Sequence, residues 1–389
     1  MMQNDVLYWI WLSQSLGFAS YKAKAVLKFY DVKNFYSLGP AEWRSCGFFC
    51  KSEIKRLESF DLKDAENILK KCSNLGYDVI TINDFCYPKA LKNISNPPCV
   101  LYTSGNLMQD YNNNLCIAII GTRNATDYGS KVAYKLSFEL AMQNVVIVSG
   151  GALGIDSYVH KGALEACCGK TISVLGCGIN YDYPVKNKVL RKEIAKKGLF
   201  ISEHPPDAPP VPKNFPLRNR IISGISNGVV VVEAPEKSGA LITANLALEQ
   251  NKDVFSVPGN IGNKTSKGTN LLIKFGAKPV LCTEDILEEY KIFEKSLKIN
   301  KKTKVDLTVN CNCFKSCDSP MKTLPKISQE SLVIFEILSN TSLFFEEICE
   351  KTSLPAKKVS TAITELEILG LINNLSGRKY SRNNEYANT

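Results

Sequence analysis

The stretch IAIIGTRNATDYGSKVA, residues 117–133, reads as an apolar strand, a tight turn at a glycine and the start of a helix. This order of elements is typical of α/β proteins that hold a phosphate where a strand ends. Arg123 stands where a dinucleotide-binding loop would have its second glycine. A guanidinium there offers a planar charged fork to a phosphate, which a turn alone does not require. The stretch therefore predicts an α/β sheet with an anion site, and it leaves open whether the ligand is a nucleotide or something larger.

Strands and helices alternate on both sides of this stretch. Several expected strands are continuous runs of Val and Ile, as in parallel strands that are covered on both faces. Repeated strand–helix units predict an α/β fold with an extended, Rossmann-like, doubly wound parallel sheet. The expected strands are residues 77–82, 116–120, 145–150, 171–176, 199–202, 228–234, 253–259 and 278–282, and the expected helices are 127–142, 155–168, 187–197, 238–250 and 268–275.

Changes in residue composition and hydrophobic periodicity divide the chain into four regions. Residues 1–75 carry short amphipathic helices, which predict a small all-α module of the SAM or helix-hairpin-helix kind with a packing or spacing role. Residues 76–292 hold the sheet. Residues 293–326 contain eight lysines against three acidic residues and no periodicity, which indicates a flexible basic linker. Residues 327–389 show three helical patterns and a two-strand ribbon, which predict a winged helix.

The winged helix is expected to contribute little to DNA binding by itself. Residues 327–389 hold six Lys and Arg against eight Glu. Its third helix has a predicted buried stripe made of Val359, Ile363, Leu366 and Leu369. Because this region has no excess of positive charge, contact with a protein or weak contact with DNA is favoured over strong binding of duplex DNA.

The composition of the chain favours a polyanionic partner. Its 389 residues hold 48 Lys and Arg against 38 Asp and Glu, a formal net charge of +10. No stretch approaches the ~20 apolar residues that span a bilayer, and the N-terminal apolar run lacks a basic lead, so neither a membrane span nor a signal peptide is expected. Fourteen cysteines without a small-domain framework indicate reduced thiols and a cytoplasmic protein.

Several expected strands end in residues suited to phosphate. Ligands of open α/β sheets bind beyond the carboxyl ends of the strands. Glycine turns follow four of the expected strands, near residues 121, 149, 176 and 234, which is more than a dinucleotide needs. Each glycine turn alone is also explained as a tight reversal of the chain. The candidate residues are Gly121, Thr122, Arg123, Gly150, Gly151, Ser238 and Gly239.

The segment PPVPKNFPLRNRIISG, residues 209–224, interleaves basic and aromatic side chains. Such a pattern suits single-stranded nucleic acid, because cations meet phosphates and a flat ring meets a base. The alternative is that Phe215 belongs to the core and that the charges form a solvated face. The prolines on each side of Phe215 argue against its burial in a helix. The candidate residues are Lys213, Phe215, Arg218, Asn219 and Arg220.

Catalytic machinery is hard to find in the sequence. The two histidines, His160 and His204, are interpreted as a packing residue and a loop-shaping residue. Asp156 and Glu233 lie at strand ends, where capping or hydrogen bonding to arginine is expected of them. No HExxH, Walker lysine or G-x-S-x-G motif is present. The sequence therefore predicts a binding protein without a cofactor.

One cysteine cluster is a weak candidate for a metal site. Cys311, Cys313 and Cys317 form a C-x-C-x₃-C pattern in the expected linker. Structural zinc sites normally have four ligands, and the nearest other cysteines, Cys282 and Cys349, lie far away in the sequence. Linker thiols are the favoured interpretation.

A series of motifs over residues 77–285 resembles the DprA (Smf) family of DNA-processing proteins of bacterial natural transformation. The motifs occur in the family's order, which makes the resemblance specific for this region. The helical start and the winged-helix tail also look like the family's three-part architecture. The motifs are IAIIGTRNATDYG, VSGGALGIDSYVHKGAL, TISVLGCGINYDYP, ISEHPP, FPLRNRIISGIS, VVVVEAPEKSGALITANLALE, VFSVPGNI and GTNLLIKFGA.

The resemblance implies a protein that binds and protects single-stranded DNA without strong sequence preference and helps to load RecA recombinase, with no catalytic turnover. It also implies a homodimer formed through the Rossmann-like domain, around residues 250–280. Lys213 lies where relatives place a basic residue at variable spacing. The residues that fall on the family's motifs are Gly121 and Arg123, Ser149 and Gly150, Phe215, Arg218, Asn219 and Arg220, and Ser238, Gly239 and Thr243.

Two other functions stay open on the sequence alone. One is a nucleotide phosphoribohydrolase-like enzyme, a group with similar glycine loops whose P-G-G-x-G-T-x-x-E signature is here replaced by EAPEKSGALITA. The other is a transcription regulator that acts through the winged helix. The sequence does not choose between a role in transformation and one in general recombination.

Overall fold

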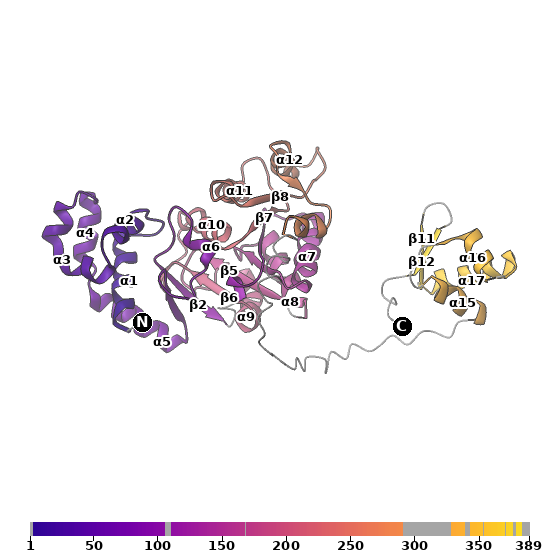
Figure 1. Cartoon of the computed structure of the whole chain (residues 1–389), viewed down its shortest axis with the longest axis horizontal. Coiled ribbons are helices and arrows are strands. Elements are labelled where there is room, and N and C mark those ends of the chain that lie inside the picture. The colour runs from indigo at the N-terminus through magenta and orange to yellow at the C-terminus, as the bar shows by residue number, and fades with distance from the viewer. Residues whose placement is uncertain are drawn as a thin grey trace, which may run out of the picture. The chain divides into compact units, whose positions relative to one another are not determined.

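The computed structural model describes residues 3–105, 110–167, 169–290, 328–338, 343–352, 354–369, 371–375 and 379–382. The chain divides into two compact units, residues 1–302 and 303–389 (Figure 1). The expected basic linker and its cysteines Cys311, Cys313 and Cys317 lie outside the described residues. In the part of the chain that the structure describes, no helix is both long and apolar enough to cross a membrane.

The N-terminal helices pack around a cluster of aromatic rings. The rings of Trp11 and Trp43 lie 5.2 Å apart between centroids, and Phe35 packs against both. This core confirms the predicted all-α module. Its helices are α1 (Gln3–Leu16), α2 (Lys22–Phe29), α3 (Val32–Ser45), α4 (Lys51–Ser59) and α5 (Leu62–Leu75).

A nine-stranded sheet follows, in the order β1-β2-β6-β5-β4-β3-β7-β8-β9. The seven strands from β6 to β9 are parallel, and β1 and β2 add an antiparallel edge. The predicted α/β fold is therefore confirmed. The strands are β1 (Asp78–Thr81), β2 (Val100–Gly105), β3 (Cys116–Ile120), β4 (Val146–Ser149), β5 (Lys170–Leu175), β6 (Leu199–Ser202), β7 (Gly228–Val231), β8 (Asp253–Ser256) and β9 (Lys278–Pro279).

Helices cover both faces of this sheet. In β3, Ile117 and Ile119 enter one core, whereas Ala118 enters the other, as the alternation of a strand buried on both sides requires. Helices α7 and α8 cover the first face, and α10, α11 and the N-terminal module share the core of the second. The remaining helices of this unit are α6 (Lys89–Lys92), α7 (Asp127–Met142), α8 (Ile155–Glu165), α9 (Lys188–Lys197), α10 (Asn214–Ile225), α11 (Gly239–Glu249), α12 (Lys267–Lys274) and α13 (Glu284–Leu287), with 3₁₀ turns at Asp110–Asn112, Val185–Asn187, Lys264–Ser266 and Glu288–Tyr290.

The strand order reverses at β3. The chain runs from β3 through β4 and β5 to β6 on one side, and then returns to place β7 on the other side of β3. At such a reversal the loops that leave neighbouring strands diverge and open a crevice for a ligand. The loop after β3, which holds Arg123, lies at this crevice.

The prolines beside Phe215, which argue against its burial in a helix, do not keep it out of one, although its ring is only half-buried. Residues Asn214–Ile225 form α10, and Pro216 lies in its first turn. A proline is tolerated there because the first amide groups of a helix have no acceptor within the helix. Phe215 is half-buried at the start of α10.

The second unit is a winged helix with its own core. It comprises α15 (Gln329–Ile337), α16 (Phe345–Thr352), α17 (Ala356–Ile368), β11 (Ile372–Leu375) and β12 (Lys379–Arg382). The ribbon gains a third strand, β10 (Leu343–Phe344), which the sequence did not predict. Val359, Ile363 and Leu366 are buried as expected, but Leu369 is 37% exposed, because it caps the end of α17 rather than facing the core.

Candidate nucleic-acid interface

The loop after β3 is fixed by its own backbone. The Thr122 amide donates to the Glu233 carbonyl at 2.8 Å, and the Thr122 carbonyl accepts from the Ile155 amide at 3.1 Å. Gly154 has a φ of +79°, and a Cβ there would lie 2.4 Å from the Thr122 carbonyl oxygen. A glycine at this position therefore allows the loops after β3 and β4 to touch backbone to backbone.

The Glu233 carboxylate, which is buried, ties three segments together. It accepts from the Thr126 amide at 3.0 Å, from the Thr126 hydroxyl at 2.6 Å and from the Thr265 hydroxyl at 3.3 Å. Thr126 in turn caps α7 through the Gly129 amide. Glu233 was expected to cap a helix or to bond to arginine, whereas its partners in the structure are hydroxyl and amide groups.

Arg123 projects from this loop as an exposed side chain. Its guanidinium carbon lies 5.7 Å from the centroid of the Phe215 ring. No ion pair engages Arg123 among the residues that the structure describes. An exposed guanidinium beside a half-buried ring can hold a phosphate while a base stacks on the ring.

Arg218 also lies near this ring, with its guanidinium carbon 6.0 Å from the ring centroid, but it is buried. Its Nη1 donates to the Gly150 carbonyl at 2.8 Å and also to the Val174 carbonyl. Burial lowers the pKa of Arg218 to about 10, and the nearby Asp156 carboxylate opposes this shift. Burial also raises the pKa of Asp156, although the Arg218 charge acts against it. Arg218 therefore joins the ends of β4 and β5 from below the crevice.

A groove of about 370 Å³ runs over the ends of β3 and β7. A smaller hollow of about 70 Å³ adjoins it and shares Arg123, Phe215 and Arg218. Most of the predicted site residues are brought together here. The groove holds Gly121, Thr122, Arg123, Phe215, Arg218, Asn219, Ser238, Gly239 and Thr243, and the hollow adds Gly150 and Gly151.

Three predicted residues do not line either hollow. The Ser149 hydroxyl is buried and donates to the Ile119 carbonyl at 2.8 Å. Lys213 is exposed and immediately precedes α10. Arg220 is buried and donates from Nη2 to both carboxylate oxygens of Glu203, at 2.7 and 2.8 Å.

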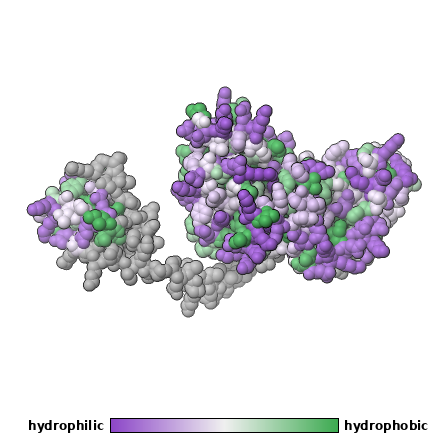
Figure 2. Space-filling view, turned by 180° about the vertical axis from the view of Figure 1, so that it is seen from behind, coloured by the Kyte–Doolittle hydropathy of each residue, from purple (hydrophilic) through white to green (hydrophobic). Residues whose placement is uncertain are grey.

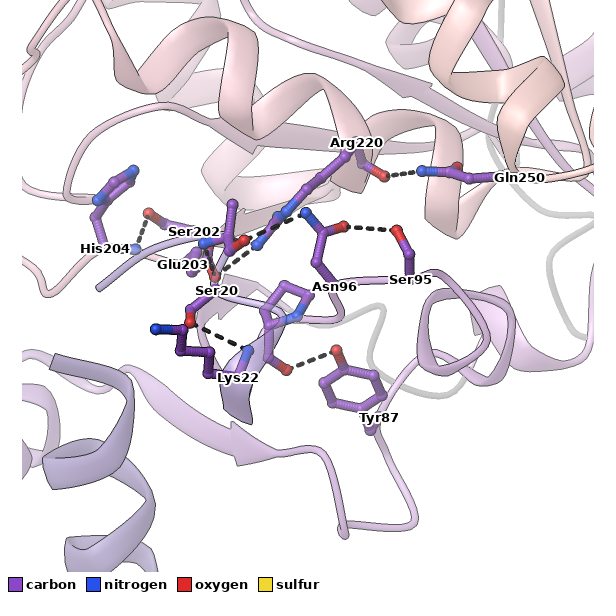
Figure 3. A network of polar contacts seen from close by, with 12 residues as sticks. Ser20, Lys22, Tyr87, Ser95, Asn96, Ser202, Glu203, His204, Arg220 and Gln250 are labelled. Atoms are coloured by element: carbon purple, nitrogen blue, oxygen red, sulfur yellow. Dashed lines mark hydrogen bonds and ion pairs between the residues drawn. The ribbon is translucent and has the colours of Figure 1, made fainter. Parts of the chain in front are cut away.

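Arg220 belongs to a junction with the N-terminal module. Figure 3 shows its side chain directed at Glu203, next to Ser202 and Asn96. Glu203 also accepts from the Ala19 amide at 3.4 Å, and Asn96 donates to the Ala19 carbonyl at 3.3 Å. The side of α10 that carries Arg220 therefore contacts the chain between α1 and α2.

Two residues that the sequence interpretation passed over also line these hollows. Lys237 lies in the groove directly before Ser238, and its side chain is exposed. Tyr183 lies in the smaller hollow, with its ring 5.3 Å from that of Phe215. Signals for both were present, since Lys237 precedes the Ser-Gly pair and Tyr183 lies in the loop that follows β5.

Both histidines are buried and away from the groove. Burial lowers the pKa of His160 to about 3, and its Nδ1 lies 2.8 Å from the Thr171 hydroxyl. Burial also lowers the pKa of His204 to about 4, and its ring packs edge-on against Phe18. They fit the packing and loop-shaping roles expected of them. The described part of the chain holds no cluster of three or more His, Cys, Asp or Glu residues placed for a metal ion.

Residues 78–291 match the family described as DNA recombination-mediator protein A, and residues 319–378 match the DprA winged helix domain. The chain is 45% identical over 214 residues to DNA processing protein DprA of Bacillus subtilis, which covers 55% of this chain and 71% of that protein. It is 32% identical to protein Smf of Synechocystis, over 98% of this chain and 100% of that protein.

A solved structure of DNA processing protein A from Helicobacter pylori is also similar. It is described as giving insights into a unique single-stranded DNA binding mode. Its sequence is 33% identical, the TM-score is 0.50, and the match covers 56% of this chain and 96% of that one.

Proposed function

Because this chain belongs to the DNA recombination-mediator protein A family, we propose that it binds single-stranded DNA along the groove at the strand ends. The observation that carries the proposal is Arg123, which is exposed beside the Phe215 ring and has no ion pair among the described residues. The related protein from Helicobacter pylori, with its single-stranded DNA binding mode, supports the same ligand. Since stacking and phosphate contacts do not discriminate strongly among bases, sequence preference is expected to be weak.

Within this proposal the exposed cations meet the phosphates. Arg123 and Lys237 lie in the groove, and Lys213 precedes α10 at its edge. Phe215 offers a ring for a base, with Tyr183 beside it. The short polar groups Ser238, Gly239 and Asn219 let the DNA backbone approach the start of α11.

The buried members of the predicted set take a positioning role. Arg218 holds the ends of β4 and β5 together, and Arg220 holds α10 against Glu203. Ser149 and Thr243 donate their hydroxyls to backbone carbonyls. Arg218 and Thr243 line the groove, whereas Ser149 and Arg220 lie behind it, and the polar groups of all four bond to the protein itself. Their effect on DNA would pass through the loops that they hold.

The proposal extends to a homodimer and to RecA loading. Around α12 and β9 the structure exposes large apolar side chains, among them Phe275 at 80% and Leu281 at 81%. A second groove of about 370 Å³ lies there, lined by Leu248, Leu272 and Phe275. Exposed apolar surface of this kind suits a second copy of the chain. Phe275→Glu should then convert a dimer into a monomer in light scattering.

The experiment that tests the function is binding of oligo-dT at several salt concentrations by wild type and by Arg123→Ala. The wild-type affinity should fall steeply with salt, and the variant should bind more weakly. Lys135→Ala, an exposed change on α7, is the matched control. Unchanged oligo-dT binding by Arg123→Ala would contradict the assignment of the groove as the DNA-binding site. Assembly of RecA filaments on DNA held by each variant tests the loading role separately.

A further inference from the structure

The N-terminal module exposes a stacked pair of aromatic rings. Phe29, at the end of α2, is 61% exposed, and Phe48, just before α4, is 36% exposed. Their ring centroids lie 5.9 Å apart with an interplanar angle of 20°. The module's packing does not depend on them in the way it depends on Trp11, Phe35 and Trp43, which are buried. The two rings stack on each other and both stay exposed, so the pair presents aromatic surface that a ligand can reach.

Lysines surround this pair. The exposed residues Tyr21, Lys24 and Lys28 are spaced three and four residues apart, so they share one face of α2. The Lys28 ammonium lies 5.7 Å from the centroid of the Phe29 ring. Lys51 is exposed at the start of α4, three residues after Phe48. The term aromatic–lysine surface is used here for Tyr21, Lys24, Lys28, Phe29, Phe48 and Lys51.

The charge of this surface is not neutralised within the described residues. No ion pair there engages Lys24, Lys28 or Lys51. The nearest carboxylates in the sequence are already engaged, since Glu53 pairs with Lys22 and Asp31 caps α3. The surface therefore presents positive charge and flat rings together, which is the chemistry of a sequence-tolerant site for single-stranded nucleic acid.

This surface is also joined to the strand-end groove. Helix α2 begins three residues after Ala19, whose amide donates to Glu203. Glu203 holds Arg220 of α10, and the same helix presents Arg218 and Asn219 to the groove. The module and the sheet belong to one compact unit and share one hydrophobic core. A strand bound in the groove and a strand bound on α2 would thus sit on parts that are held together.

We propose that the aromatic–lysine surface is a second contact site for single-stranded DNA, which rests on the proposed function of the groove. A base stacks on the Phe29 and Phe48 rings, and Lys24, Lys28 and Lys51 meet the flanking phosphates. The groove holds a short strand by itself. A longer strand continues onto the module and gains the second contact.

The test uses the full chain with both Phe29→Ala and Phe48→Ala. Affinity for an oligo-dT of about 8 nucleotides, which fills one site, should not change, whereas affinity for one of about 40 nucleotides should fall about tenfold or more. Phe85→Ala, at an 86% exposed ring elsewhere, is the control and should affect neither oligonucleotide. Because the exchanged rings are exposed, the melting temperature should stay within a few degrees of wild type.

Equal affinity of the double variant and wild type for the longer strand would overturn the proposal. So would unchanged DNA binding with lost stimulation of RecA assembly, which would mark the surface as a protein-docking site. The groove proposal is tested separately by the affinity of Arg123→Ala for the shorter oligo-dT. Unchanged affinity there would contradict the groove proposal, whatever the result for the aromatic–lysine surface. As a direct readout, Phe29→Trp should lose fluorescence when the longer oligo-dT binds, since the native Trp9, Trp11 and Trp43 are buried.

Discussion

The loop after β3 and the helix α10 both carry arginines near the crevice, but the arginine of the loop is exposed and those of the helix are buried. Arg123 of the loop is exposed and free of ion pairs among the described residues, whereas Arg218 and Arg220 of α10 are buried with partners. The difference follows from position. The loop leaves the sheet toward open space, while α10 packs across the face of the sheet under the N-terminal module. Residue type alone therefore does not identify a ligand contact. Burial assigns Arg218 and Arg220 a role in positioning parts of the protein, and exposure leaves Arg123 as the proposed DNA contact.

The strongest test of this contrast is Arg220→Ala. It leaves the buried Glu203 carboxylate without its cation, which typically costs about 3–5 kcal/mol. The free energy of unfolding in urea should fall by that amount. The salt slope of oligo-dT binding should stay unchanged, because no phosphate contact is lost. A stable variant with a shallower salt slope would instead make Arg220 a DNA contact.

The buried segment after β6, whose Glu203 pairs with Arg220 of α10, should also respond to acid. His204, whose pKa is lowered to about 4 by burial, stays neutral in the folded chain while the unfolded chain takes up its proton below about pH 6.5. Its contribution to stability is complete above about pH 6.5 and is lost as the pH falls toward 4, by about 2–3 kcal/mol.

The measurement is urea unfolding of wild type and His204→Gln between these pH values. The variant should show a shallower loss of stability as the pH falls, because it lacks the proton uptake of the unfolded state. His160→Gln, at a second buried histidine, should flatten the same curve independently. Parallel curves for wild type and both variants would contradict the assignment of the buried, neutral histidines.

On the exposed side of the contrast, Arg123→Ala should weaken oligo-dT binding by about 1–3 kcal/mol, the usual effect of losing a charged hydrogen bond. The slope of the logarithm of the binding constant against the logarithm of the salt concentration should become shallower by about one, and the free energy of unfolding should not change. Arg123→Lys keeps the charge and should keep the slope while losing part of the affinity. A loss of stability in Arg123→Ala would place this residue with the arginines of α10.

The smallest effect is expected in the winged helix. Lys357→Ala together with Lys358→Ala should change oligo-dT affinity by less than about twofold, because Lys358 already pairs with Glu330 at 3.0 Å and the unit is rich in glutamate. Fluorescence anisotropy of the full chain measures this. A loss as large as that of Arg123→Ala would show that the winged helix shares the DNA contact.

Much of the fold could be predicted from local patterns, because several of the parallel strands are continuous apolar runs. Strand β2 was missed because its apolar residues Val100–Tyr102 give way to Thr103, Ser104 and Gly105, which look like a turn, and no helix follows. Helix α10 is not predicted, because the prolines on each side of Phe215 argue against burial of that ring in a helix, yet Pro216 is accommodated in the first turn. Local sequence does not show where a helix begins relative to a proline.

The candidate site was predicted as a set of residues, but not their individual states. Glycine turns and basic residues identified the candidate site, because such residues follow several of the expected strands. The burial of Arg220 depends on Glu203, an acidic residue 17 positions away in the chain. Partners at such separations meet only in the folded molecule, so their pairing has no local signature.

The Glu233 carboxylate has a thermodynamic consequence. It holds the loop after β3, the cap of α7 and the segment around Thr265 in one arrangement before any ligand arrives. The entropy lost on association would then fall mainly on the flexible DNA strand rather than on the protein loops. Substitutions of Glu233 would loosen the groove without removing a ligand contact, and would weaken binding through this added ordering cost.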